Sequence, residues 1–215
     1  MTPREPGRFV TLEGIEGAGK STVAQHVVAW LNARGRSARL TREPGGTVLA
    51  ERVRAIVLER GAELLTPVTE TLLMFAARGI HLDNLIRPAL ARGEWVVCDR
   101  FTDATRAYQA AGHGVSRAWV EQLAQAVHPH LAPDCTLLLD LPVALGLARS
   151  KKRGGAAPAD RFEAQPAAFF ERVRAAYLDL ARSEPQRIRV IDAAQPLRQV
   201  ERQIETALAG LVDLK

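Results

Sequence analysis

Long apolar runs are missing from this sequence of 215 residues. A helix that spans a membrane needs about 20 consecutive apolar residues, and no run in the chain reaches that length. Residues 1–6 also lack the apolar stretch of a secretory signal peptide. We therefore expect a cytoplasmic protein with no membrane partner.

Cysteine is scarce, since the chain holds only Cys98 and Cys135. They lack the close pairing of a zinc-binding C-x₂-C motif. Both lie in apolar runs, so we expect two reduced thiols in the core. Four histidines show no metal-ligand pattern with acids, and we expect them at the surface or partly packed: His26, His81, His128 and His130.

Internal repeats and low-complexity tails are absent as well, and the length suits one domain, 1–215, with room for a small inserted lid. The net charge is +5, but the basic residues are scattered, apart from one dense run at 149–153. A basic excess suits a nucleic-acid partner and equally an enzyme that holds polyanionic nucleotides. Charge alone does not decide between them.

The strongest positive signal is Gly14–Ser21, which matches the phosphate-binding P-loop pattern G-x-x-x-x-G-K-[ST]. Glycines let successive backbone N–H groups point at phosphate oxygens. Lys20 would reach the β- and γ-phosphates, and the Ser21 hydroxyl would bind Mg²⁺. The pattern assigns ATP binding to the whole run and the residue after it: Gly14, Ile15, Glu16, Gly17, Ala18, Gly19, Lys20, Ser21 and Thr22.

Alternating apolar patterns around this loop predict an α/β fold. Strands are expected at 8–12, 38–41, 95–98, 135–139 and 187–191. Helical spacing is expected at 20–34, 47–60, 67–91, 102–110, 116–127, 143–150, 166–183 and 197–212. This alternation predicts a five-stranded parallel sheet with helices on both faces. Ligands bind such a sheet beyond the carboxyl ends of its strands.

Polar residues follow two of the predicted strands. Asp99 would orient Mg²⁺ or hold an arginine, and Arg100 would offer a bidentate fork to a phosphate. The other interpretation, a helix cap followed by a solvated arginine, is less favoured beside a P-loop. Residues 41–47 form a Pro-Gly-Gly turn that opens a helix, and its charged pair, Arg42 and Glu43, is expected to face the site.

Residues 149–165 are expected to form a mobile loop between two helices, because residues 154–159 are rich in glycine, alanine and proline. In an enzyme that transfers phosphoryl groups, a flexible loop with arginines typically closes over the site and excludes water. We therefore predict a lid at about 149–165.

Six ordered motifs, at 9–14, 41–47, 74–78, 99–101, 107–109 and 160–163, together resemble those of bacterial thymidylate kinases, a P-loop nucleoside-monophosphate kinase family. The resemblance runs from about residue 8 to residue 212. It implies transfer of the γ-phosphoryl group of ATP to dTMP, with Mg²⁺, by an enzyme that is commonly a homodimer. The apolar residues Leu72, Leu73 and Phe75 lie in a predicted helix that is a candidate for this interface and equally for the core.

The resemblance also implies a role for each matching residue. Catalysis would use Lys20, Arg100 and Arg153, the last from the lid, since the P-loop has no arginine at its variable positions. Mg²⁺ would be held by Ser21 and Asp99. Glu13 would face the deoxyribose, Arg78 would donate to a thymine carbonyl, and Tyr108 would crowd the 2′ position. The full substrate-binding set is Glu13, Arg42, Met74, Arg78, Arg100, Thr105, Tyr108 and Gln109.

The chain departs from the family pattern in three places. Met74 stands where a phenylalanine usually stacks on the base, and methionine has a less defined geometry there. His113 replaces an arginine in a loop that alanines should stiffen. The lid is longer than expected, which leaves open whether Arg149, Arg153 or Arg161 reaches the γ-phosphate.

Two other classes of P-loop protein compete with this interpretation. One is a P-loop kinase for another small acceptor. The other is a regulatory GTPase or a nucleic-acid ATPase. The sequence has no N-K-x-D guanine signature, and its strands end in Asp99-Arg100 and Asp140-Leu141 rather than Asp-Glu. We therefore expect ATP and dTMP as partners and no nucleic acid.

Overall fold

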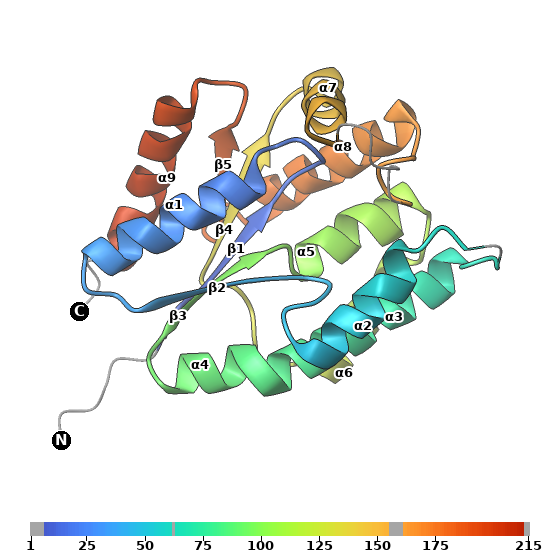
Figure 1. Cartoon of the computed structure of the whole chain (residues 1–215), viewed down its shortest axis with the longest axis horizontal. Coiled ribbons are helices and arrows are strands. Elements are labelled where there is room, and N and C mark those ends of the chain that lie inside the picture. Colours follow the sequence, from blue (N-terminus) through green and yellow to red (C-terminus); the bar gives the residue numbers. More distant parts are fainter. Residues whose placement is uncertain (1–6, 62, 155–160, 213–215) are drawn as a thin grey trace.

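A parallel sheet forms the centre of the molecule (Figure 1). The structure is a computed structural model that describes residues 7–61, 63–154 and 161–212, without the side chain of Arg153. Within these residues the sheet has five strands in the order β2-β3-β1-β4-β5. They are β1 (Phe9–Glu13), β2 (Ala38–Arg42), β3 (Trp95–Asp99), β4 (Cys135–Asp140) and β5 (Ile188–Asp192). The predicted fold class is confirmed, and every predicted strand is present within one residue of its expected bounds.

Helices cover both faces of the sheet (Figure 1). α1 (Lys20–Ala33) and α9 (Leu197–Val212) pack together on one face. The other elements are α2 (Val48–Leu58), α3 (Pro67–His81), η1 (Leu82–Ile86), α4 (Arg87–Ala91), α5 (Thr102–Thr105), η2 (Arg106–Gly112), α6 (Arg117–Val127), α7 (Val143–Gly154) and α8 (Ala167–Ser183). No described helix is long and apolar enough to cross a membrane.

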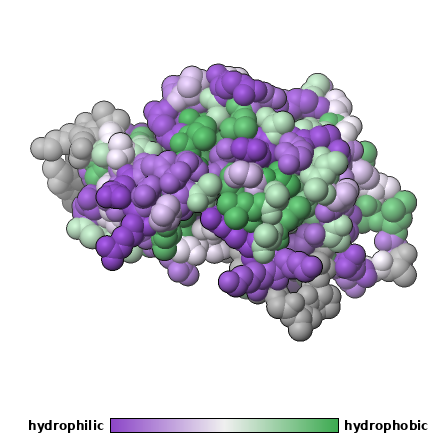
Figure 2. All heavy atoms as spheres, turned by 90° about the horizontal axis from the view of Figure 1, so that it is seen from above, coloured by the Kyte–Doolittle hydropathy of each residue, from purple (hydrophilic) through white to green (hydrophobic). Residues whose placement is uncertain are grey.

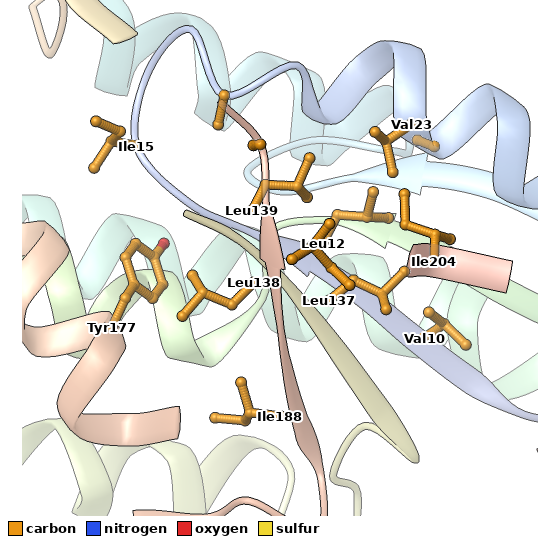
Figure 3. Packing of buried hydrophobic residues seen from close by; sticks show 14 of the residues in the cluster. Val10, Leu12, Ile15, Val23, Leu137, Leu138, Leu139, Tyr177, Ile188 and Ile204 are labelled. Carbon is orange, nitrogen blue, oxygen red and sulfur yellow. The ribbon is translucent and has the colours of Figure 1, made fainter. Parts of the chain in front are cut away.

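The alternation of side chains along the strands explains this two-sided burial, because successive strand residues point to opposite faces. Val10 and Leu12 of β1 pack toward Val23 of α1 and Ile204 of α9, whereas Leu138 of β4 lies on the other side with Ile188 and Tyr177 (Figure 3). Phe9 faces a second cluster, formed with η1 and α4. Both Cys98 and Cys135 are buried free thiols, as expected.

Three predicted helices have different boundaries in the structure. The region 67–91 is divided by the π-helical turn η1, which precedes Pro88, a residue that has no N–H to donate to the preceding turn. The region 102–110 continues as the π-helix η2 to Gly112. α7 runs to Gly154, so the first part of the predicted loop 149–165 is helical, since no glycine or proline interrupts residues 147–153. Residues 155–160 of the predicted lid lie outside the described residues.

Candidate active site

A cavity of about 480 Å³ opens at the carboxyl edge of the sheet, beside the P-loop. On the face of the molecule seen in Figure 2, hydrophilic residues surround smaller groups of apolar ones near its centre. The cavity is lined by residues from six separate segments of the chain: Glu16, Gly17, Gly19, Lys20, Ser21, Thr22, Arg42, Glu43, Pro44, Arg54, Leu58, Met74, Asp99, Arg100, Ala104, Tyr108, Gln109, Phe162 and Glu163. It therefore brings together most of the site residues that the sequence predicted.

The P-loop turns sharply between β1 and α1. Gly17 has a φ of 75°, and a Cβ there would lie 2.0 Å from the carbonyl oxygen of Gly146 in α7. Only glycine permits that approach. Gly19, with a φ of 90°, precedes the first turn of α1. The loop therefore presents the amino end of α1 to the cavity, an arrangement that favours anions.

Lys20 is buried at the base of this loop. Its Nζ donates to the carbonyl oxygens of Gly14 (3.1 Å) and Ile15 (3.0 Å), so the ammonium rests on the loop itself. Burial, followed by the nearby Arg100 guanidinium, lowers the pKa of Lys20. A phosphate group in the cavity would add negative charge beside this buried cation.

Arg100 follows β3 in the left-handed region, with a φ of 72°. Such a conformation is strained for a residue with a side chain and is typical of functional sites. It is held by the backbone N–H, which donates to the carbonyl oxygen of Leu12 (2.9 Å). The guanidinium donates to Glu16 Oε1 (2.7 Å) and the Tyr108 hydroxyl (2.9 Å), and lies 4.5 Å from the Tyr108 ring centroid.

Asp99 lies beside Arg100 on the cavity wall. Its buried Oδ1 has no hydrogen-bond partner among the described residues. A buried carboxylate oxygen without a donor is costly, which indicates a ligand outside the protein. Ser21 lines the same cavity, so an acidic oxygen and a hydroxyl are available there for a hard cation, and this donor set fits Mg²⁺. No larger cluster of metal-binding side chains occurs among the described residues.

The turn after β2 brings a second basic group to the cavity. Arg42 lines the cavity and donates to Glu51 Oε2 (2.9 Å) at the first turn of α2. Thr47 caps this helix, as the turn predicted. Arg54, one further turn along α2, also lines the cavity and donates to the carbonyl oxygen of Pro44 (2.8 Å). Sequence reasoning missed Arg54, because nothing in a helical pattern marks which solvated arginine faces a site.

α3 supplies Met74 and Arg78 from consecutive turns of one helix face. Met74 lines the cavity, whereas Arg78 is buried behind it. The Arg78 guanidinium donates from Nε to Glu43 Oε2 (2.7 Å) and from Nη2 to Thr105 Oγ1 (3.1 Å). Thr105 is fully buried and reaches the site only through this contact.

Tyr108 and Gln109 both line the cavity, although neighbouring residues of an α-helix point in different directions. They lie in the π-helix η2, a rare form that is frequent at functional sites. Gln109 donates from Nε2 to Glu70 Oε1 (2.6 Å), while its buried Oε1 has no partner in the described part of the chain. His113, one of the three departures from the family pattern, packs on the Phe169 ring (4.7 Å between centroids) and does not line the cavity.

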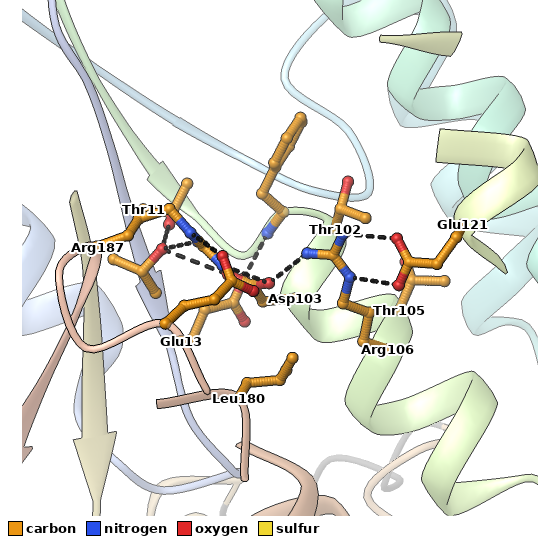
Figure 4. Close-up of polar contacts among 12 residues, drawn as sticks. Thr11, Glu13, Thr102, Asp103, Thr105, Arg106, Glu121, Leu180 and Arg187 are labelled. Carbon is orange, nitrogen blue, oxygen red and sulfur yellow. Dashed lines mark hydrogen bonds and ion pairs between the residues drawn. The ribbon is translucent and has the colours of Figure 1, made fainter. Parts of the chain in front are cut away.

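A buried ionic network braces this side of the cavity (Figure 4). The carboxylate of Asp103 in α5 accepts hydrogen bonds from Arg106 (2.7 Å) and from Arg187 (2.7 Å). Arg187 lies directly before β5. Arg106 continues the network to Glu121 of α6 (2.9 and 2.7 Å). These contacts hold α5 and η2 against the sheet, and the two arginines keep the pKa of Asp103 below its usual value despite burial.

Glu13 does not line the cavity, unlike the position that the resemblance implies. Its carboxyl group is fully buried and accepts from the Phe101 N–H (2.8 Å) and the Tyr177 hydroxyl (2.7 Å). Burial, together with the nearby Asp103 carboxylate, raises the pKa of Glu13 to about 8. In this structure Glu16, rather than Glu13, is the P-loop acid on the cavity wall.

Two of the three candidate lid arginines are held elsewhere. Arg149 donates to the carbonyl oxygen of Ala193 (2.9 Å). Arg161 pairs with buried Glu70 of α3 and donates to the carbonyl oxygens of Val57 and Leu65. The side chain of Arg153 lies outside the described residues. Sequence reasoning missed Glu70, which bonds both Arg161 and Gln109. In a helical pattern it is indistinguishable from an ordinary exposed glutamate.

The expectation for the histidines is wrong for two of the four. His81 is completely buried and bonds Glu43 and Thr41. His128 is also buried and bonds Thr102 (2.8 Å). Both sit opposite hydroxyl or carboxylate groups from distant segments, so sequence spacing gave no sign of their partners.

Comparison with known proteins agrees with this geometry. Residues 12–204 match the family model described as thymidylate kinase. A thymidylate kinase of Pseudomonas savastanoi pv. phaseolicola is 52% identical over 209 residues, covering 97% of this chain and 98% of that protein. One of Pseudomonas putida (strain W619) is 54% identical over 205 residues, covering 95% and 98%.

A solved structure is similar as well. The crystal structure of a thymidylate kinase from Ehrlichia chaffeensis superposes with a TM-score of 0.76 at 30% identity, covering 95% of this chain and 99% of that one. The family match and the structural likeness both extend over the P-loop and the other segments that line the cavity. This chain therefore belongs to the thymidylate kinase family.

Proposed function

We propose that this protein transfers the γ-phosphoryl group of ATP to dTMP, giving dTDP and ADP, a step in the supply of dTTP. The observation that carries the proposal is the single cavity that holds both the P-loop Lys20 and a second polar wall made by Arg100, Tyr108 and Gln109. A nucleotide hydrolase needs one nucleotide pocket, whereas a kinase must hold donor and acceptor phosphates together.

The P-loop side would hold ATP. Backbone N–H groups of the loop and the amino end of α1 would cradle the phosphates. Lys20 would leave the carbonyl oxygens of Gly14 and Ile15 to reach the β- and γ-phosphates, as the charge on the transferring group develops. Thr22 lies on the same cavity wall, next to the phosphate end of the helix.

Ser21 and Asp99 would hold Mg²⁺, which, when bound, neutralises charge on the phosphates of ATP. The support is the unpartnered Oδ1 of Asp99 and the position of Ser21 on the same cavity. Two protein groups suffice, because Mg²⁺ usually keeps several waters and takes its remaining ligands from substrate phosphates.

The opposite wall would hold dTMP. Arg100 and Arg42 would grip its phosphate, and both line the cavity as cations with planar forks. Arg78 would donate to the thymine base, with Met74, Thr105 and Gln109 around it. Tyr108, whose ring lies against Arg100, would crowd the sugar. Glu13 would act on the sugar only through Tyr177 and the backbone of Phe101, which it bonds.

The reaction needs no general base, since the attacking oxygen of dTMP is already anionic. Rate acceleration would come from alignment of the two phosphates and from fixed positive charge around the transferring group. Arg100 aligns the acceptor, Lys20 stabilises the donor phosphates, and Arg153 is proposed as the lid arginine that completes the charge. Arg149 and Arg161 are less suited, because neither lines the cavity and both bond protein acceptors away from it.

We also propose that the protein is a homodimer. Support comes from large apolar side chains on α2 and α3 that are about half exposed or more: Leu49 (50%), Ile56 (54%), Val68 (52%) and Leu72 (46%). α2 and α3 pack against each other, so these residues belong to one helical layer. Phe75, a candidate from the sequence, is buried in a core cluster instead. Sedimentation of the native protein and of Ile56→Lys checks this assignment, which a monomeric wild-type protein contradicts.

A panel of nucleoside monophosphates with ATP and Mg²⁺ tests the reaction. We expect rapid ADP formation with dTMP, far slower formation with dCMP, dGMP and AMP, and little ATP hydrolysis without an acceptor, because a closed site excludes water. ADP formation that needs DNA rather than dTMP contradicts the proposal.

A further inference from the structure

Behind the acceptor wall, four buried side chains form a continuous chain of hydrogen bonds. Thr41 at the end of β2 meets His81 Nε2 (2.7 Å), and His81 Nδ1 meets Glu43 Oε1 (3.1 Å). The second carboxylate oxygen of Glu43 accepts from Arg78 Nε (2.7 Å). The chain therefore links β2, the turn after it and the end of α3.

The side chains of this chain are almost inaccessible to solvent, although Glu43 also belongs to the cavity lining. The side chains of His81, Glu43 and Arg78 are 0%, 2% and 1% exposed. The turn leaves room for it only because residue 46 is glycine: a Cβ on Gly46 would lie 2.4 Å from His81 Nε2 and 2.5 Å from Thr41 Oγ1. A buried polar chain with this fit is a specific arrangement, since each member left unpaired would cost free energy.

At its end the chain orients the Arg78 guanidinium. Nε is fixed by Glu43, Nη2 by the carbonyl oxygen of Phe101 (3.2 Å) and by Thr105, and the group lies between the rings of Phe75 and Phe101 (4.7 and 5.1 Å). The remaining nitrogen, Nη1, is buried and has no acceptor among the described residues. Its direction is set, because the guanidinium is planar and held at two other nitrogens.

A single Arg78–Glu43 contact would leave the carboxylate free to rotate. His81 prevents this by holding the other oxygen, and it lies three residues after Arg78 on the same side of α3. An ionised carboxylate only accepts hydrogen bonds, so Nδ1 of His81 must donate to it. Burial disfavours the charge on Glu43, yet Arg78 and His81 together hold the pKa of that carboxyl below its usual value.

We propose that His81 is a positioning residue for base selection: through Glu43 it fixes Arg78 so that Nη1 meets the carbonyl at position 4 of the acceptor base. The proposal deepens the proposed function and rests on the role given there to Arg78. A base that carries an amino group at position 4 offers a donor instead of an acceptor, so it would leave Nη1 unpaired.

Two substitutions at one position separate this role from packing. In His81→Asn the side-chain amide nitrogen takes the position of the imidazole Nδ1 and can still donate a hydrogen bond to Glu43. The contact with Thr41 is lost. In His81→Gln the amide reaches the place of Nε2, and the contact with Glu43 is lost. We expect His81→Gln to raise KM for dTMP about tenfold, as loss of one charge-assisted contact does, with kcat and KM for ATP nearly unchanged. His81→Asn should stay within about threefold of the wild type.

Base selection gives a readout that packing would not move. The acceptor 5-methyl-dCMP differs from dTMP only along the N3 and C4 edge, and the ratio of kcat/KM for the two acceptors should fall about tenfold in His81→Gln but stay near the wild-type value in His81→Asn. His128→Gln is the matched control, because His128 is also buried and bonds a threonine hydroxyl but no carboxylate. His128→Gln should leave KM for dTMP and the kcat/KM ratio of the two acceptors unchanged.

Equal effects of the Asn and Gln substitutions, or equal increases in KM for dTMP and ATP, would overturn the inference. If either variant fails to fold, the wild-type protein with ¹⁵N-labelled histidine replaces it. Saturating dTMP should then shift the Nδ1 resonance of His81, and 5-methyl-dCMP should shift it less. An unchanged resonance overturns the inference. A wild-type protein that does not phosphorylate dTMP overturns the proposed function instead.

Discussion

The two walls of the cavity use different parts of the chain to meet nucleotides. The P-loop wall is one contiguous run whose polar groups are mostly backbone N–H and C=O, with the single cation Lys20 resting on them. The acceptor wall is made of side chains from β2, α3, β3 and η2, and buried ion pairs such as Glu43–Arg78 stand behind it. A backbone site keeps its shape through its own turn, whereas a side-chain site depends on what packs behind it.

The largest loss of unfolding free energy should come from a substitution in the ionic network that supports the acceptor wall. Asp103→Asn removes the charge that Arg106 and Arg187 share, and breaking a buried ion pair on one side costs about 3–5 kcal/mol. Urea unfolding should show this loss. The exposed pair Arg182–Asp179 on α8 supplies the control, because it shares no residue with the network and Arg182→Ala should cost less than about 1 kcal/mol. Similar losses in both variants would mean that the network contributes no more than surface charges do.

Glu13, at the junction of the two walls, should make stability depend on pH. Its pKa in the folded protein is about 8, above the usual glutamate value of 4.5. A raised pKa means that the folded state favours the protonated form, so this contribution is complete below pH 4.5 and is lost as pH rises to about 8. Glu13→Gln keeps a neutral group, and its advantage over wild type should grow across that window, by up to about 4 kcal/mol, since one pKa unit is about 1.4 kcal/mol. The unfolding free energies of the wild type and of Glu13→Gln are compared at pH 5, 6.5 and 8.5. A difference that stays the same at all three pH values would show that Glu13 is ionised in the folded protein.

Alanine substitutions of the three candidate lid arginines should differ sharply in their effect on kcat. If Arg153 supplies charge to the transferring group, Arg153→Ala should lower kcat about 10²–10³-fold while Kd for ATP changes little. Arg153→Lys should recover part of the rate, because it keeps the charge and loses the planar fork. Arg149→Ala and Arg161→Ala are the comparison variants, since Ala193 and Glu70 already bind those side chains. A severe loss of kcat in Arg161→Ala with a mild one in Arg153→Ala would transfer the role to Arg161.

On the P-loop wall, Lys20→Ala should lower kcat about 10²-fold, equivalent to about 3 kcal/mol of transition-state stabilisation. The unfolding free energy should change far less than in Asp103→Asn, because the hydrogen bonds that Lys20 makes within the described residues go to carbonyl oxygens of its own loop. Steady-state kinetics and urea unfolding of the same preparation measure both values. Turnover near the wild-type rate would contradict the assigned role of the P-loop.

The smallest effect on function should appear in nucleotide binding at the acceptor wall, measured for a substitution that also leaves buried Glu43 without its ion-pair partner and should therefore lower the unfolding free energy. Arg78→Ala removes a charge-assisted donor and should weaken dTMP binding by about 1.5–3 kcal/mol, with Kd for an ATP analogue nearly unchanged. Isothermal titration with each nucleotide measures the difference. Equal weakening of the two would mean that Arg78 supports the fold of both walls.

The predictable parts of the site are those with a local cause. Residues 14–21 were assigned from spacing alone, and the strands before and after them from apolar alternation. Positions at the ends of predicted strands indicated Arg42 and Arg100, the resemblance added Met74, Tyr108 and Gln109, and the structure brings all five to the cavity. Asp99 and Ser21 lie there too.

Other expectations failed where a distant partner decides the outcome. His81 looked like a surface residue, but a turn 40 residues earlier supplies both of its hydrogen-bond partners. For Phe75 the sequence left interface and core equally open, and contact with α6 decides for the core. Glu13 points to Tyr177 rather than to the cavity, because α8 brings a hydroxyl within 2.7 Å.

By itself, the sequence determined the parallel α/β fold, the P-loop and the family to which the chain belongs, because periodicity, glycine placement and short motifs act over neighbouring residues. Only the tertiary structure decided which charges are buried, which side chains support Arg78, and that Arg161 is held by Glu70. The reason is physical: backbone turns follow from local steric limits, whereas the free energy of a buried charge depends on partners that other segments of the chain bring to it.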